Sequence, residues 1–145
     1  MTNERILQVA RILLRLALGI TFLVSVADRF GALGRNGTRN VSWGDWKHFV
    51  QYVATLNWFV PKGLIPALSV LETTIEIALG IALLVGLWQR TVAWCSAGLL
   101  LSFALTMSIA LGIVAPLSYS VFTAFGSAFL LGAVAHPQAN RSLSP

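Results

Sequence analysis

Residues 64–87 read LIPALSVLETTIEIALGIALLVGL, an apolar stretch that two acidic residues interrupt. A membrane-spanning helix needs roughly 20 mostly apolar residues, so this stretch is long enough to cross a bilayer. Its Leu, Ile and Val residues contribute about −4 to −8 kcal/mol to insertion, whereas Glu72 and Glu76 would cost about +5 to +7 kcal/mol. We therefore expect these carboxyl groups, which share one helix face, to be protonated, paired or turned toward water.

A second apolar stretch repeats part of the first, because Arg15-LALGI resembles Glu76-IALGI. The alignment places opposite charges, Arg15 and Glu76, at matched positions near the middle of two apolar spans. An ionisable side chain in lipid is costly and is by default a functional candidate with a partner. Since neighbouring antiparallel helices would bring both groups to a similar depth, we expect an Arg15–Glu76 ion pair. The pair either fixes the helix register or, with Glu72, lines a polar pocket for a ligand or proton.

The composition of the 145-residue chain excludes a water-soluble domain. Hydrophobic residues make up 57%, charged residues 10%, and the mean hydropathy is +0.78, whereas soluble domains carry roughly 25% charged residues. The net charge of +5 is dispersed along the chain, which does not favour nucleic-acid binding. A single cysteine, Cys95, excludes an internal disulfide and a multi-cysteine metal site. No metal site and no catalytic residue is assigned.

The predicted fold class is all-α, a transmembrane four-helix bundle with an amphipathic interfacial helix in its long first connection. Residues 1–145 form a single membrane domain, with predicted spans at about 6–27, 64–87, 92–114 and 118–135. Residues 115–119, which include Pro116, are expected to form the turn between the last two spans. The first span has a rival interpretation as a signal peptide cleaved after Ala27, but the repeat favours a retained helix.

The predicted location is the cell inner membrane, which the chain crosses several times. With the N-terminus inside, four basic residues lie on the cytoplasmic side: Arg5, Arg11, Arg90 and Arg141. Five lie on the other side: Arg29, Arg35, Arg39, Lys47 and Lys62. These counts hardly differ, but long loops weigh less, so we expect both termini in the cytoplasm.

The long first connection, about residues 28–63, is predicted to lie over the membrane surface, and we call it the lid. Within it Trp46, Phe49, Val50 and Val53 recur at helical spacing, which indicates an amphipathic helix. The lid's candidate ligand-flanking residues are Trp43, Trp46 and His48. The candidate interfacial charges are Asp28, Arg29 and Arg90. His48 and His136 are the two histidines, and their positions in the lid and after the last span do not favour haem ligation.

These motifs together resemble the DoxX family of small four-helix bacterial membrane proteins. The resemblance rests on Arg15-Leu16-x-Leu18-Gly19-x-x-Phe22, on Glu76-x-x-Leu79-Gly80, and on Leu84-x-Gly86-Leu87-x-x-Arg90. It implies an inner-membrane bundle associated with oxidoreductase systems, in which Arg15, Glu76 and Arg90 occupy the family's charged positions.

Three functional hypotheses follow. The first is an accessory subunit of a membrane oxidoreductase system near the quinone pool, with the lipid bilayer and an oxidoreductase subunit as partners. No cofactor would be covalently bound, and a quinone would fit a mostly apolar pocket with a few donors. The second is a non-catalytic scaffold or assembly protein. The third is a small proton or solute pathway in a homo-oligomer. Whether the protein is an enzyme is left open.

Overall fold

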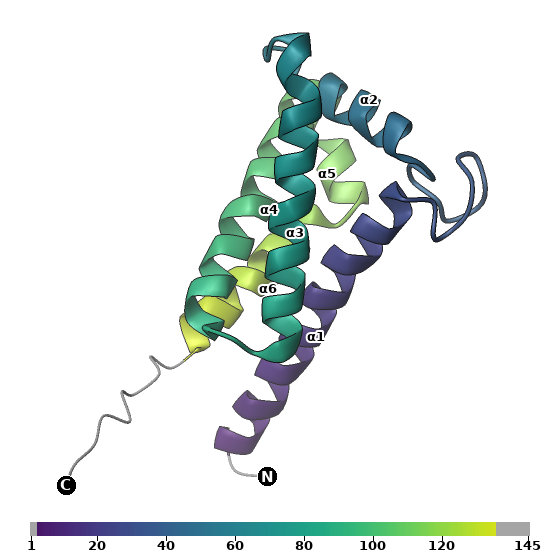
Figure 1. The fold of residues 1–145 in the computed structure, drawn as a ribbon. Coiled ribbons are helices and arrows are strands. Elements are labelled where there is room, and N and C mark those ends of the chain that lie inside the picture. Colours follow the sequence, from purple (N-terminus) through teal and green to yellow (C-terminus); the bar gives the residue numbers. More distant parts are fainter. Residues whose placement is uncertain (1–2, 136–145) are drawn as a thin grey trace, which may run out of the picture.

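The computed structural model describes residues 3–135, and that part of the chain is helical without any strand (Figure 1). The elements are α1 (Asn3–Arg29), α2 (Trp46–Leu56), the 3-10 turn η1 (Lys62–Leu64), α3 (Ile65–Val85), α4 (Gln89–Leu111), α5 (Val114–Ser118) and α6 (Val121–Val134). The all-helical prediction is confirmed. His136 and Arg141, which entered the haem and orientation arguments, lie outside the described residues.

Within residues 3–135, three helices are long and apolar enough to cross a membrane: α1, α3 together with η1, and α4. The predicted fourth crossing at 118–135 contains a shorter apolar helix, α6, of 14 residues. The turn expected at residues 115–119 lies in the connection between α4 and α6, but this connection contains a short helix, α5, that includes Pro116. A proline is tolerated in the first turn of a helix, where its missing N–H has no intrahelical partner. Helix α4 ends before the predicted turn, with Gly112 as its C-cap residue.

The long helices lie side by side and alternate in direction along the chain (Figure 1). Helix α1 packs on α3 and α6, and α4 packs on the same two helices. Helix α2 and the preceding loop lie across one end, whereas the first turn of α1 and the last turn of α6 lie at the other end (Figure 1). This arrangement separates the lid from the α3–α4 turn by the full length of α3.

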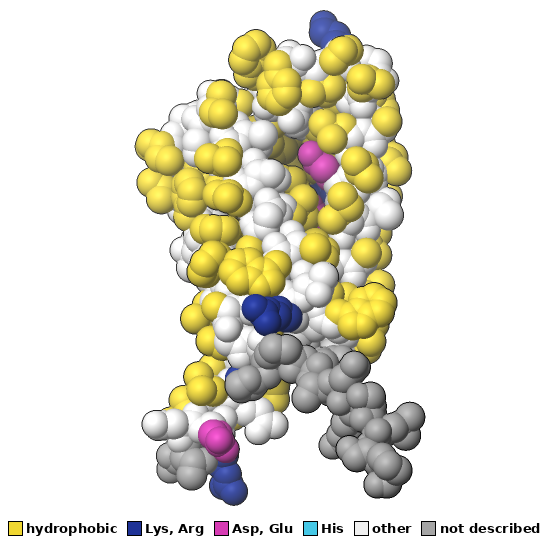
Figure 2. Space-filling model, turned by 90° about the vertical axis from the view of Figure 1, so that its left-hand side faces the viewer, with side chains coloured by type: hydrophobic (Ala, Val, Ile, Leu, Met, Phe, Trp, Pro, Cys, Tyr) yellow, Lys and Arg dark blue, Asp and Glu magenta, His cyan; other side chains and the backbone are white. Residues whose placement is uncertain are grey.

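The outer surface of the molecule is apolar. Large hydrophobic side chains are exposed on every long helix, for example Leu13 (60% exposed), Val85 (65%) and Ile109 (74%). Figure 2 shows such side chains over most of one face. A water-soluble monomer does not expose so much contiguous apolar surface, whereas lipid matches it. These helices are therefore consistent with a membrane location.

Two glycines of the sequence repeat mark the place where α1 and α3 cross. A Cβ atom built on Gly19 would lie 2.9 Å from Leu84 Cδ2 and 3.0 Å from the carbonyl oxygen of Gly80. A Cβ atom on Gly80 would lie 3.0 Å from Leu23 Cδ2. Leu84, four residues after Gly80, therefore packs on Gly19, and Leu23, four residues after Gly19, packs on Gly80. Small residues allow this close approach, which holds two helices together by van der Waals contact.

Replacing Gly19 by alanine should destabilise the fold by about 1–3 kcal/mol, because the added methyl group collides with both Leu84 and a backbone oxygen. The measurement is denaturant unfolding of the purified protein in detergent micelles. Gly98→Ala in α4 is the matched control, since nothing lies within 4 Å of its Cβ position. Equal stability of the two variants would contradict a tight crossing at Gly19.

Candidate functional site

A buried ion pair joins the end of α1 to the middle of α3. Arg29 Nη2 donates to Glu76 Oε1 at 2.6 Å, and the two side chains are 3% and 1% exposed. Arg29 Nη1 also donates to the hydroxyl of Thr73 at 2.7 Å. Among the described residues, Arg29 Nε and Glu76 Oε2 are buried without a hydrogen-bond partner. The α1–α3 interface therefore contains a polar centre with unused hydrogen-bonding capacity.

The predicted Arg15–Glu76 pair is wrong, because Arg15 binds the other end of α3. Its Nε donates to the carbonyl oxygen of Leu83 at 2.9 Å, and its Nη2 donates to that of Leu84 at 3.1 Å. A cation at these last carbonyls complements the negative end of the helix dipole. Gly86, at φ +85°, ends α3 with its backbone close to the Arg15 guanidinium.

The geometry of the helix crossing explains this error. Arg15 precedes Gly19 by four residues, and Glu76 precedes Gly80 by the same number. In an antiparallel pair that crosses at these glycines, the two matched positions lie on opposite sides of the crossing. At 1.5 Å per residue they are separated by about 12 Å along the helix axes. Matched positions in the repeat are thus partners only at the crossing itself.

Aromatic rings of the lid cover the Arg29 guanidinium. Its Cζ atom lies 3.9 Å from the centroid of the Phe49 ring and 5.3 Å from that of Trp43. A guanidinium over an aromatic face gains a cation–π attraction that strengthens when water is excluded. Arg29 was predicted to be an interfacial charge, and the structure shows that its side chain is buried within the protein. It is a buried link between α1, α3 and the lid.

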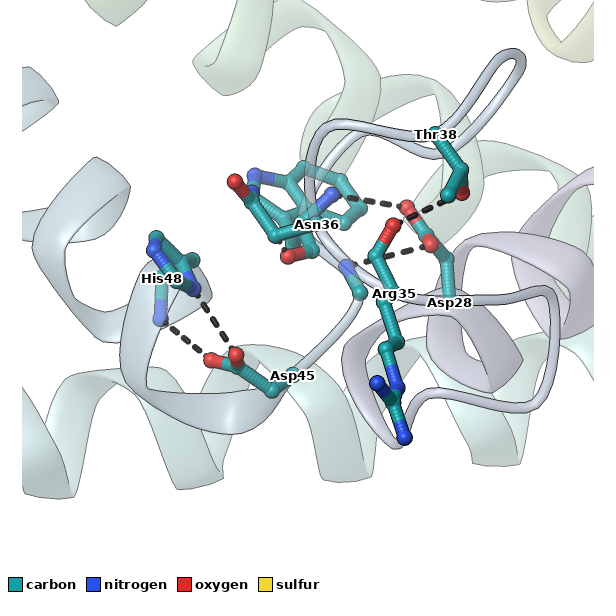
Figure 3. Close-up of polar contacts among 8 residues, drawn as sticks. Asp28, Arg35, Asn36, Thr38, Asp45 and His48 are labelled. Carbon is teal, nitrogen blue, oxygen red and sulfur yellow. Dashed lines mark hydrogen bonds and ion pairs between the residues drawn. The ribbon is translucent and has the colours of Figure 1, made fainter.

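Asp28 fastens the lid to the end of α1. Its Oδ2 accepts hydrogen bonds from the backbone N–H groups of Ser42 at 2.9 Å and Trp43 at 3.0 Å. Its Oδ1 accepts from that of Gly44 at 3.3 Å (Figure 3). Gly44 has φ +70°, and a Cβ atom there would collide with the backbone of Asn36. Asp28, also predicted to be an interfacial charge, is 4% exposed and is thus likewise buried within the protein.

The other candidate residues of the lid, Trp43 and Trp46, lie near these hydrogen bonds of Asp28. Trp43 packs against the edge of Phe49, with 5.3 Å between the ring centroids. Trp46 stacks on Phe30 at 5.6 Å. Both tryptophans are half-buried. Both therefore pack against other lid residues, and Trp43 also contacts Arg29.

His48 belongs to the cap of α2. The Asp45 carboxylate accepts from the backbone N–H of His48 at 2.9 Å and lies 2.8 Å from its Nδ1 (Figure 3). The pKa of Asp45 is lowered below its usual value, mainly because its carboxylate accepts this hydrogen bond from the backbone N–H of His48. A lowered carboxyl pKa means that the cap is intact at neutral pH and is lost as acid protonates Asp45.

Glu72 lies one turn before Glu76 on α3 and is half-buried. It forms no ion pair within 4 Å in the described part of the chain. Figure 2 shows acidic atoms with basic atoms behind them in a recess of the apolar surface. Arg90 is exposed on the first turn of α4, away from this group. Within residues 3–135, no cluster of three metal-binding side chains occurs.

The site therefore differs in membership from the one predicted. Arg29 contacts Thr73 and Glu76, and Glu72 lies one turn away on α3. Asp28, next to Arg29 in the chain, completes this cluster through its bonds to the lid, and Arg15 lies outside it. Thr73 was not among the predicted site residues. Its spacing of three residues from Glu76, on the same helix face, is the signal that could have found it.

A family model described as "Methylamine utilisation protein MauE" matches residues 6–115. The match extends from the first turns of α1 into α5 and includes every residue of the Asp28–Arg29–Thr73–Glu76 cluster. No curated protein and no solved structure matches the chain. The resemblance to DoxX is therefore wrong. Its Leu-Gly phrases coincide with the crossing of α1 and α3, a feature that membrane helices share across families.

Proposed function

The chain belongs to the MauE family of membrane proteins, and we propose that it is an accessory membrane protein that acts with an oxidoreductase partner in methylamine utilisation. The family match over residues 6–115 is the observation that supports this proposal. The apolar exterior of α1, α3 and α4 agrees with a function inside the bilayer.

We further propose that α6 is the fourth crossing and that both termini lie in the cytoplasm. Fourteen helical residues span about 21 Å, against roughly 30 Å of hydrocarbon. Helix α5, which precedes α6, supplies a further apolar segment at the lid end (Figure 1). The described ends of α1 and α6 point to the same side of the molecule, as an even number of crossings requires (Figure 1).

The polar cluster would hold the lid in one position over the helix ends. Arg29 contacts α3 through Glu76 and the lid through Phe49, while Asp28 binds three lid amides. The lid also exposes Trp58 and Phe59, which are 70% and 63% exposed. Exposed aromatic side chains suit a headgroup layer or a protein partner. We therefore place the partner-binding surface on the lid.

Growth on methylamine tests this function. Deletion of the gene in its own host should abolish growth with methylamine as the nitrogen source and leave growth with ammonium unchanged. A copy of the wild-type gene should restore growth, whereas an Arg29→Met copy should not, because the lid loses its anchor. An Arg5→Gln copy is the control, since Arg5 is exposed near the start of α1. A deletion strain that still grows on methylamine would refute the proposal.

A purely scaffolding function is the second candidate, favoured by the complete burial of the Arg29–Glu76 pair. It predicts that the combined swap Arg29→Glu with Glu76→Arg recovers growth that each single swap abolishes. If the double swap stays inactive while it remains folded, the two residues act on something besides each other.

A quinone ligand remains a prediction, as does a proton or solute pathway along Glu72 and Glu76. A groove of about 390 Å³ between α2 and the start of α3 offers a mostly apolar space lined largely by lid residues. Its lining includes Val50, Ala54 and Ile65, with Lys62 as a donor. A planar apolar ring with a carbonyl would suit such a lining. A quinone titration that leaves the thermal stability unchanged would argue against this use.

A further inference from the structure

A second recess, of about 460 Å³, lies at the end of the molecule opposite the lid. Four polar side chains of α1 line it at successive turns of one helix face: Glu4, Gln8, Arg11 and Arg15. Gln89, the first residue of α4, lines it from the other side. Leu7 and Ile12 complete the lining, so the recess has apolar edges.

The charge of this recess is positive. Arg11 and Arg15 supply two guanidinium groups, against the single carboxylate of Glu4. Arg15 is held in place by the last carbonyls of α3. Arg11 Nε is buried and has no hydrogen-bond partner among the described residues. The first turn of α4 carries no acidic residue and no side-chain cap. Carbonyl oxygens of α3 accept from Arg15, but no ion pair among the described residues balances the positive charge of the two arginines.

The recess also lies at a definite depth. Arg15 binds the end of α3, where that apolar helix stops, and we take this level as the edge of the hydrocarbon layer. Arg11 is one turn farther out on α1, which extends beyond the neighbouring helices at this end (Figure 1). Arginine side chains at this level reach the headgroup layer, where lipid phosphates lie.

We propose that this recess binds a phosphate group, as carried by the headgroup of an anionic phospholipid. The planar guanidinium of Arg11 presents paired N–H donors that fit two phosphate oxygens, and Arg15 adds a second positive charge. Leu7 and Ile12 would contact the first carbons of the lipid chains. This site is independent of the lid and of the proposed function in methylamine utilisation.

Thermal unfolding of the full chain in neutral detergent tests the proposal with three probes: phosphatidylglycerol, phosphatidylcholine and inorganic phosphate at matched ionic strength. Phosphatidylglycerol should raise the melting temperature, and phosphatidylcholine should raise it less. Arg11→Gln should weaken the apparent affinity by about tenfold, the usual cost of a lost charge-assisted hydrogen bond. Arg11→Lys keeps the charge but loses the paired donors, so it should give an intermediate effect.

Arg5→Gln is the matched control, because Arg5 is exposed on the same helix and does not line the recess. A response to inorganic phosphate alone that Arg11→Gln abolishes would identify a free anion as the ligand. Absence of any response, or responses of equal size in Arg11→Gln and Arg5→Gln, would overturn the site.

Discussion

Replacing Arg29 by methionine should destabilise the folded protein by about 3–5 kcal/mol, the largest effect we expect of a single substitution. The change leaves the Glu76 carboxyl group, 1% exposed, without its charged partner. It also removes the hydrogen bond to Thr73 and the contact with the Phe49 ring. The measurement is denaturant unfolding in micelles, followed by the circular dichroism of the helices.

A double-mutant cycle isolates the ion pair. Arg29→Met combined with Glu76→Leu should recover much of the loss, because no buried charge remains. Arg15→Met and Glu76→Leu should instead act additively, since these residues bind opposite ends of the α1–α3 crossing. A double variant of Arg29 and Glu76 that is as unstable as Arg29→Met alone would contradict a coupled pair. Arg90→Met, at an exposed position, controls for loss of an arginine.

Replacing Asp28 by alanine should release the lid and cost about 2–4 kcal/mol, because three backbone N–H groups lose their acceptor. Hydrogen exchange should accelerate at the amides of Ser42, Trp43 and Gly44 and remain slow in the centre of α3. Limited proteolysis should cut within residues 28–63 sooner than in the wild type. Asp28→Asn should show a smaller effect, since its amide keeps one acceptor oxygen.

Asp45→Ala provides the contrast within the same lid. Its side chain caps the first turn of α2 and forms no hydrogen bond with α1 in the described structure. We therefore expect faster exchange at the His48 amide and an unchanged rate at Trp43. If Asp28→Ala behaved in the same limited way, the carboxylate of Asp28 would not be what fastens the lid.

The helices were largely predictable because apolar runs of membrane length have few alternatives to helix. The helix of the lid was also predictable, since Trp46, Phe49, Val50 and Val53 share a face, and α2 begins at Trp46. The fourth span was predicted less well. The sequence after Arg90 contains no charged residue that would indicate where α5 ends and α6 begins. Pro116 was predicted to form a turn, but a proline is also tolerated in the first turn of a helix, which is its position in α5.

The membership of the polar site was not predictable from depth alone. Two charged residues at similar depth become partners only if the helix crossing places them on the same side. The crossing itself was visible in the sequence as Gly19 and Gly80, and reading it would have excluded the Arg15–Glu76 pair. Asp28 could not be placed, because its partners are backbone amides of residues 42–44 and backbone amides leave no sequence signal.

The two arginines of α1 have a joint mechanical consequence. A close glycine contact would by itself let α1 and α3 pivot about a single point. Arg15 ties α1 to the last carbonyls of α3, and Arg29 ties it to Glu76 on the far side of that point. Two ties on opposite sides oppose this rotation, so we expect α1 and α3 to move as one rigid unit. Because α4 and α6 pack extensively on each other, we expect motion between helices chiefly at the interface between the α1–α3 pair and the α4–α6 pair.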